Sequence, residues 1–166
     1  CWSYGLTIAI SYVNVVDCSV TGSPSLQGTG ISIVGATAPS YVVVSNIDRC
    51  SFFCHNFGVE AFAYTQGLNI NQSNFVSCNA GVANPPNATG LVQFTIMGNQ
   101  FGDIKNSAIL LNTAVPGTIL SSNVFLMDNG TTAINCIYAA QFSILGNTFL
   151  TGSSLGATGV YIGTVG

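Results

Sequence analysis

A hexapeptide pattern that recurs six times constrains the fold of this chain more than any other feature. Each copy has an aliphatic residue at its first position and a small polar or thiol residue at its fourth, and five copies have phenylalanine at the sixth. The copies span residues 15–20, 47–52, 70–75, 96–101, 120–125 and 144–149, beginning 32, 23, 26, 24 and 24 residues apart. A period in the mid-twenties is typical of a stacked-repeat architecture.

Two longer segments support this period. Residues 93–99 read Gln-Phe-Thr-Ile-Met-Gly-Asn, and the nearly identical Gln-Phe-Ser-Ile-Leu-Gly-Asn follows 48 residues later at 141–147, a distance of two repeats. Between the hexapeptides, short runs with alternating apolar residues predict further strands. No stretch of ten or more residues carries a helical stripe. We therefore expect two or three short strands per repeat, with the extra residues of the longest repeat, about 35–40, forming a loop.

The composition excludes several classes of function. Hydrophobic residues make up 48% of the chain, charged residues only 4%, and the formal net charge is −3. This composition is the opposite of that of a disordered chain, which combines low hydrophobicity with high charge. Two basic residues are too few to bind a nucleic-acid backbone or an anionic membrane surface. No apolar run approaches the roughly 18 to 20 residues that span a bilayer. We expect one domain over residues 1–166, and the missing initial methionine suggests a fragment of a longer chain.

A repeat of this length can form one coil of a parallel β-solenoid, each strand pairing with its counterparts in the coils above and below. The pattern Ile-x-x-Asn-x-Phe resembles the right-handed parallel β-helix of the pectate-lyase and phage-tailspike superfamily over nearly the whole chain. The resemblance implies an all-β fold of about six to seven coils of roughly 24 residues. A leucine-rich repeat would need closely spaced leucines before the asparagine, and a β-sandwich gives no reason for a fixed hexapeptide.

In such a solenoid, equivalent positions lie about 4.8 Å apart along the axis. The first-position residues should then form an aliphatic stack inside the tube, and the sixth-position residues an aromatic stack that includes Phe75, Phe101, Phe125 and Phe149. A buried amide without partners costs about 1–3 kcal/mol. We therefore expect the fourth-position amides to bond to one another as a ladder, formed by Asn99, Asn123 and Asn147.

Few residues could carry chemistry. Asp103 and Asp128 follow the sixth-position phenylalanine on adjacent coils, and Glu60 is the sole glutamate. Such an acid pair can act on a glycosidic bond, and the resemblance implies carboxylates along an outer strand face, with calcium or a basic residue. These three are the catalytic candidates, although the preference of turns for aspartate is a simpler explanation of the pair. Asp17 and Arg49 should form an exposed ion pair.

Neither a metal nor a cofactor is expected, because the single histidine, His55 beside Cys54, does not make a zinc site. The six cysteines lack CxxC spacing, so we expect mostly free thiols. Cys18 and Cys50 fall in the inward fourth-position row, where cysteine acts as a small hydrophobe. If any pair forms a disulfide, Cys54 with Cys78 is the first candidate.

Three functions are compatible with these features. The first is a structural and receptor-binding segment of a phage or virus tailspike or fibre, located in a virion tail or at a cell surface, that recognises surface polysaccharide through exposed aromatics such as Tyr41, Tyr64 and Tyr138. The resemblance to tailspikes implies a homotrimer. The second is a polysaccharide lyase or glycoside hydrolase of the same fold. The third is a segment of a bacterial surface adhesin.

Overall fold

The computed structural model describes residues 4–23, 25–35, 41–43, 45–53, 55–128, 130–138, 140–151 and 156–163. Within these ranges the chain forms 21 short β-strands and no helix. The described residues therefore contain no helix that is long and apolar enough to cross a membrane.

Three sheets contain nearly all of the strands. Sheet A has the order β1 (Tyr4–Ile8), β4 (Thr29–Ile33), β8 (Phe57–Ala61), β12 (Ala80–Asn84), β15 (Ser107–Leu111), β18 (Thr132–Cys136) and β21 (Thr158–Ile162). Sheet B has β2 (Asn14–Val16), β6 (Asn46–Asp48), β10 (Asn69–Asn71), β13 (Thr95–Met97), β16 (Ile119–Ser121) and β19 (Ser143–Leu145). Sheet C has β3 (Ser19–Thr21), β7 (Ser51–Phe53), β11 (Asn74–Val76), β14 (Gln100–Gly102), β17 (Val124–Met127) and β20 (Thr148–Thr151).

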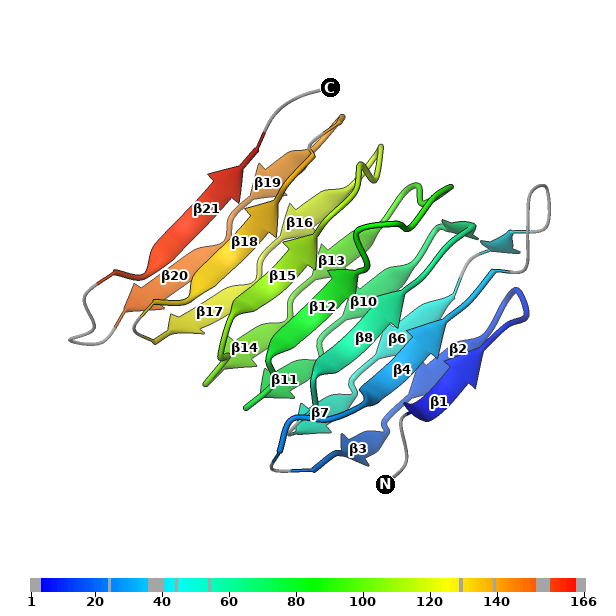
Figure 1. Cartoon of the computed structure of the whole chain (residues 1–166), viewed down its shortest axis with the longest axis horizontal. Helices are drawn as coiled ribbons and strands as arrows, with labels where there is room; N and C mark the ends of the chain where they lie inside the picture. The colour runs from blue at the N-terminus through cyan, green and yellow to red at the C-terminus, as the bar shows by residue number, and fades with distance from the viewer. Residues whose placement is uncertain are drawn as a thin grey trace.

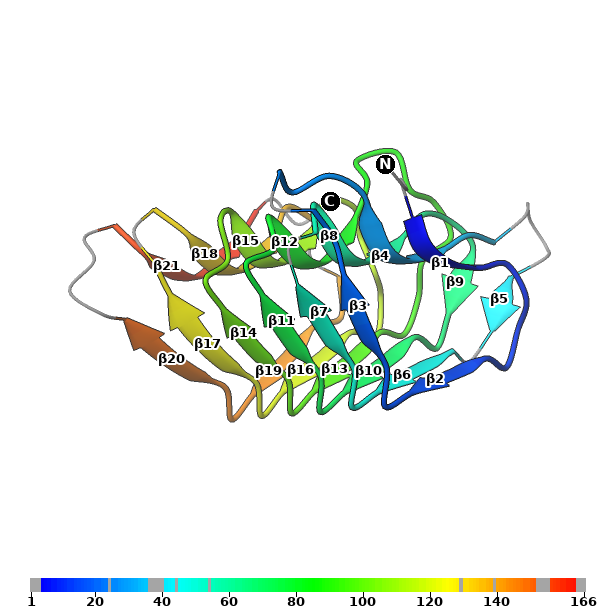
Figure 2. The ribbon, with the colours of Figure 1, turned by 90° about the horizontal axis from the view of Figure 1, so that it is seen from below.

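The chain passes through sheets A, B and C in turn and then begins the next coil, so the paired strands of the described residues run parallel. Figure 1 shows the coils following one another from β1 at one end to β21 at the other. Figure 2 shows sheets B and C meeting at a sharp lower edge, with sheet A above them. The short strands β5 (Val42–Val43) and β9 (Thr65–Gln66) pair between sheets A and B. The all-β parallel solenoid of about six coils that the period predicts is confirmed.

Each hexapeptide contains the last two residues of a sheet B strand, a two-residue bend and the first two residues of a sheet C strand. Its third residue has a positive φ in every copy, between 49° and 68°, whether it is glycine or not; the six are Asp17, Arg49, Gln72, Gly98, Ser122 and Gly146. A single left-handed residue turns the chain sharply between two extended segments. This bend directs the fourth residue into the tube.

The strand register places the rows of the sequence pattern directly over one another. In sheet B, Ile70 pairs with Ile47 on one side and with Ile96 on the other. In sheet C, Phe75 pairs in the same way with Phe52 and Phe101. Both rows lie in the core: Ile47, Ile70, Ile96, Leu120, Phe52, Phe75, Phe101 and Phe125 are all 0% exposed. Burial of each such side chain contributes about 1.5–3 kcal/mol, so the two rows supply much of the cohesion between coils.

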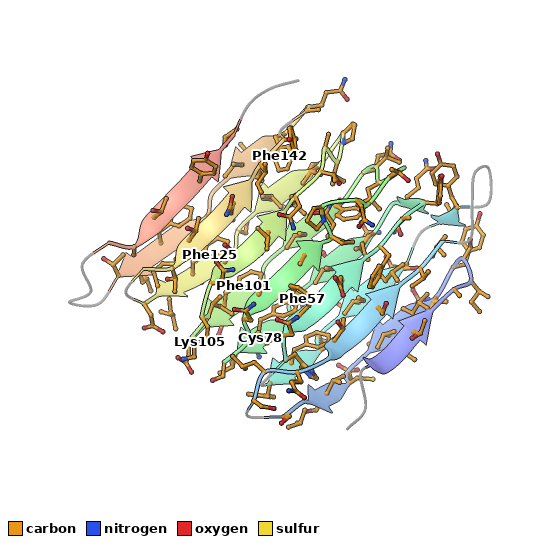
Figure 3. The ribbon with its side chains drawn as sticks, viewed as in Figure 1. Phe57, Cys78, Phe101, Lys105, Phe125 and Phe142 are labelled. Carbon is orange, nitrogen blue, oxygen red and sulfur yellow. The ribbon has the colours of Figure 1, made fainter. Side chains whose placement is uncertain are left out.

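The phenylalanine rings form one continuous stack. The centroids of neighbouring rings are 4.9 to 5.2 Å apart from Phe52 to Phe149, with interplanar angles of 8° to 10°. Figure 3 labels Phe101 and Phe125, which are neighbours in this stack. Sheet A approaches the rings closely through glycine: a Cβ at Gly58 would lie 2.5 Å from Cδ1 of Phe75. The residue that faces the rings is thus glycine on β4, β8 and β12, whereas the same register position holds Ala108 on β15 and Ala133 on β18.

The fourth-position asparagines are hydrogen-bonded in a column. The Nδ2 of Asn99 donates to Oδ1 of Asn123 at 3.0 Å, and the Nδ2 of Asn123 donates to Oδ1 of Asn147 at 3.0 Å. Each Oδ1 also accepts the backbone N–H of the preceding rung, and each Nδ2 also donates to a carbonyl of the preceding coil's sheet B strand. The side-chain amides thus provide hydrogen-bond partners for the backbone N–H and C=O groups at the bend, where the hydrogen bonding of the sheets is interrupted.

Replacing Asn123 with alanine should destabilise the protein by about 2–4 kcal/mol, because the backbone N–H of Asn99 and the carbonyl of Ile96 lose their partner inside the tube. Urea unfolding followed by circular dichroism measures the change. Asn74→Ala, at an exposed position of β11, is the matched control and should change stability by less than about 0.5 kcal/mol. Equal effects of the two substitutions would contradict the role of the column.

Candidate functional site

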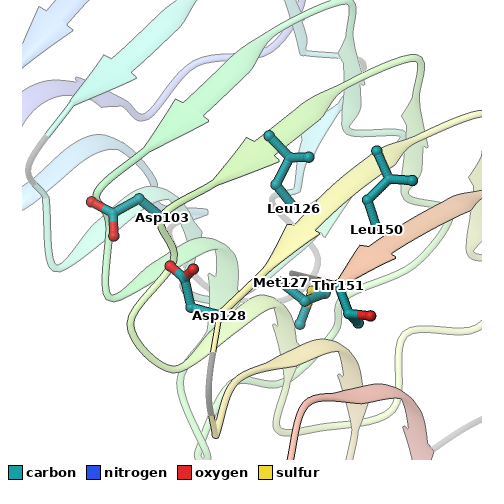
Figure 4. Close-up of a pocket in the computed structure, with 6 residues that line it drawn as sticks. All are labelled: Asp103, Leu126, Met127, Asp128, Leu150 and Thr151. Atoms are coloured by element: carbon teal, nitrogen blue, oxygen red, sulfur yellow. The ribbon is translucent and has the colours of Figure 1, made fainter. Parts of the chain in front are cut away.

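An open depression of about 510 Å³ lies where sheet C turns toward sheet A in the later coils (Figure 4). Its lining residues are Asp103, Leu126, Met127, Asp128, Leu150 and Thr151. Asp103 directly follows β14, Asp128 directly follows β17, and Leu150 and Thr151 end β20. Three consecutive coils thus contribute to one surface.

Successive side chains on the strands of sheet C point alternately into the core and outward, and the outward ones form an apolar floor for this depression. Because Phe125 and Phe149 occupy the inward row, the next residue on each strand points outward, and Leu126 and Leu150 are 51% and 48% exposed. These two leucines pair directly in the register of β17 and β20. On the preceding coil the same column holds Gly102, where an added Cβ would lie 3.6 Å from Leu126. The missing side chain leaves one flank of Leu126 uncovered.

Asp103 is held in place by polar neighbours on two coils. Lys105 forms an ion pair with it, and the hydroxyl of Ser77 donates to its Oδ2. The hydrogen bond from Lys105, followed by that from Ser77, lowers the pKa of Asp103 below its ordinary value of 3.8. Asp103 is therefore an ionised hydrogen-bond acceptor at neutral pH, and its side chain is still 49% exposed.

Glu60 lies elsewhere. It is on β8 of sheet A, where alternation places it on the face opposite to the core residues Val59 and Ala61, and it does not line the depression. The side chain is nevertheless only 6% exposed and accepts a hydrogen bond from Oγ1 of Thr29 at 3.0 Å. Burial raises the pKa of Glu60 above its ordinary value of 4.5, and the bond from Thr29 opposes this shift. The structure therefore brings together two of the three candidate acids.

The three candidate tyrosines do not form one site. Tyr41 and Tyr64, in the connections from sheet A to sheet B of consecutive coils, contact each other edge to face with centroids 5.7 Å apart and rings inclined by 83°. Both are half-buried, and Gly90 lies against the ring of Tyr64. Tyr138 follows β18, three coils further along, and is 47% exposed.

The remaining charged and thiol candidates have structural partners. Arg49 donates to Asp17 from Nε at 2.8 Å and from Nη2 at 3.1 Å, with side-chain exposures of 50% and 66%, and it also pairs with Asp48. Such an exposed ion pair contributes little to stability. His55 is buried, its Nε2 lies 3.1 Å from the carbonyl of Val20, and burial lowers its pKa. Cys54, named in the predicted disulfide, lies outside the described residues.

Among the described residues, no group of three or more histidine, cysteine, aspartate or glutamate side chains is arranged to hold a metal ion. The apolar floor was not anticipated from the sequence. Its signal was the leucine that follows the inward phenylalanine in the last two hexapeptides, together with the glycine at the same place one coil earlier.

Comparisons of the chain with protein-family models, with curated proteins and with solved structures gave no match in any of the three. The function must therefore be inferred from the chemistry of this surface.

The raised pKa of Glu60 predicts a pH-dependent stability. A folded-state pKa above the unfolded value stabilises the fold fully below the unfolded pKa, and this contribution is lost as pH rises through the folded pKa. Glu60→Gln retains an acceptor for Thr29 but cannot ionise. The variant should therefore gain stability relative to the parent as pH rises above the ordinary glutamate value of 4.5, measured by urea unfolding at each pH. Parallel pH profiles of the two proteins would contradict burial of an ionisable Glu60.

Proposed function

We propose that this solenoid is a structural and carbohydrate-binding segment of a phage or virus tailspike or fibre, and that it recognises polysaccharide outside the cell. The observation that carries the proposal is the depression in which the exposed pair Leu126 and Leu150 lies beside the ionised carboxylate of Asp103. A sugar ring has an apolar C–H face and a rim of hydroxyl donors, so it needs both kinds of surface at once.

The side chains of the depression are held in place by the surrounding structure, which favours binding. Leu126 and Leu150 project from strands that are hydrogen-bonded to each other, and Asp103 is fixed by Lys105 and Ser77 before any ligand arrives. Side chains that are already ordered lose little conformational entropy on binding. With only 4% charged residues, the rest of the surface offers mainly neutral groups, which suits a neutral or weakly charged glycan.

A polysaccharide lyase or glycoside hydrolase is the second candidate, because Asp103 and Asp128 share one depression. General acid catalysis on a glycosidic bond requires a carboxyl group with a raised pKa. The pKa of Asp103 is lowered instead, and the carboxyl group with a raised pKa, Glu60, lies in sheet A away from the depression. Binding without cleavage therefore fits these groups better than catalysis.

Binding should depend on both halves of the site. We expect Leu126→Ala and Asp103→Asn each to weaken the affinity for a bound polysaccharide at least about tenfold, or about 1.4 kcal/mol, in affinity electrophoresis against a panel of capsular polysaccharides and pectins. Asp17→Asn, an exposed acid on another edge, is the matched control and should leave affinity unchanged. Retention that is identical in all variants would overturn the site. A fall in polymer length during incubation would favour the enzyme.

A homotrimer that packs side by side is part of the same proposal. The outer face of sheet B carries Met97, Ile119 and Leu145, which are 44%, 42% and 59% exposed. These residues lie on three consecutive strands, with Ser121 between Met97 and Leu145 in the register. Exposed apolar side chains gathered on one face support an interaction surface there.

The trimer is tested by light scattering coupled to size exclusion. We expect a particle with three times the mass of the chain, and a shift toward the monomer when Ile119 is replaced by lysine. Gln100→Lys, at an exposed position of sheet C, is the control and should leave the particle mass unchanged. A monomer at every accessible concentration would refute the trimer without affecting the carbohydrate site.

A further inference from the structure

The chemistry of the fourth-position column changes along the solenoid. Its last three rungs are the amides already described, the third rung is the hydroxyl of Ser73, and the first two rungs are the thiols of Cys18 and Cys50. The column is continuous across this change, since the backbone N–H of Cys50 donates to Oγ of Ser73 at 3.0 Å and that of Ser73 donates to Oδ1 of Asn99 at 2.9 Å. The two thiols thus replace the hydrogen-bonded amides at one end.

The register places these thiols next to each other. Val16 pairs with Asp48 just before the bend, and Ser19 pairs with Ser51 just after it. Cys18 and Cys50 therefore occupy equivalent positions of adjacent coils, with Cα atoms about 4.8 Å apart. This spacing lies within the range of about 4.4–6.8 Å that a disulfide spans.

Each sulfur atom lies near a backbone carbonyl oxygen of β2. The Sγ of Cys50 lies 3.5 Å from the carbonyl oxygen of Val15, and the Sγ of Cys18 lies 3.3 Å from that of Val16. Burial is the main cause that raises the pKa of Cys50. Both thiols are free in the structure, and the register places them on adjacent coils.

The two cysteines differ in access. Cys50 is 1% exposed, whereas Cys18 is exposed even though it belongs to the inward row. The reason is that β2 and β3 are the terminal strands of sheets B and C, so the first coil has a neighbour on one side only. The same freedom allows this coil to make the small shift that brings the Cβ atoms to the roughly 3.8 Å of a disulfide.

We propose that Cys18 and Cys50 form an oxidative cross-linking site that joins the first coil covalently to the second. The Cys18 thiolate attacks a low-molecular-weight disulfide such as oxidised glutathione, which forms a mixed disulfide and releases one glutathione thiol. The Cys50 thiolate then attacks the Cys18 sulfur, forming the protein disulfide and releasing the second glutathione. Two protein thiols are oxidised, one glutathione disulfide is reduced, and the two protein protons leave on the released thiols.

The bridge would close the longest repeat, whose hexapeptides begin 32 residues apart. A cross-link across a segment of this length restricts the unfolded chain and prevents the first coil from opening separately. The site does not depend on the carbohydrate proposal, because no residue is shared with the depression.

The test uses the whole chain, purified in the reduced state, incubated with oxidised glutathione near pH 8, alkylated and digested without reduction. We expect one peptide that links Cys18 to Cys50 with the loss of two hydrogen atoms, and a rise in Tm of about 5–10 °C that dithiothreitol reverses. In Cys50→Ser the reaction should stop at glutathione on Cys18, and Cys18→Ser should show no rise in Tm.

Cys136→Ser is the matched control, because this cysteine is buried on β18 and burial raises its pKa to about 12; the linked peptide should still form. A stable glutathione adduct on Cys18 of the parent protein would overturn the proposal. So would a linkage between other cysteines, including Cys54 and Cys78, in place of the Cys18–Cys50 peptide. Cys18→Ser changes an exposed side chain, so the Tm comparison stands even if Cys50→Ser does not fold.

Discussion

In-register hydrogen bonding between coils is the constraint from which the rest of the structure follows. Each strand pairs in parallel with the same strand of the next coil, so like residues lie over like. Phenylalanine stacks on phenylalanine at 4.9 to 5.2 Å, and asparagine bonds to asparagine at 3.0 Å. A slip of one residue would turn the aromatic row outward and leave the amides without partners. Register and core composition therefore stabilise each other.

The same alternation that fills the core also builds the outer surface. On β17 the inward Phe125 is followed by the outward Leu126, and the coil-to-coil pairing then places Leu150 beside it. The apolar floor of the depression therefore projects from strands that are hydrogen-bonded to each other. Lys105 and Ser77 keep Asp103 ionised, which makes it a fixed acceptor and a poor proton donor. The proposal of polysaccharide binding rests on this surface.

The ends of the solenoid differ from its middle because each terminal coil has one neighbour. Phe149 is 38% exposed, whereas Phe125 in the same stack is fully buried. Cys18 is exposed for the same reason at the other end, although Cys50 directly beside it is buried. Among the described residues, the coils at the ends of the sheets therefore bury these rows less completely than the coils between them.

The sequence by itself determined the solenoid, its rows and the adjacency of Asp103 and Asp128, because in stacked repeats a fixed sequence spacing becomes a fixed neighbour in space. It did not determine the burial of Glu60 on the outer face of sheet A or the contact between Tyr41 and Tyr64. These features depend on connections of unequal length and on packing outside the tube. The repeat sets no period there, so only the tertiary structure decides which side chains meet.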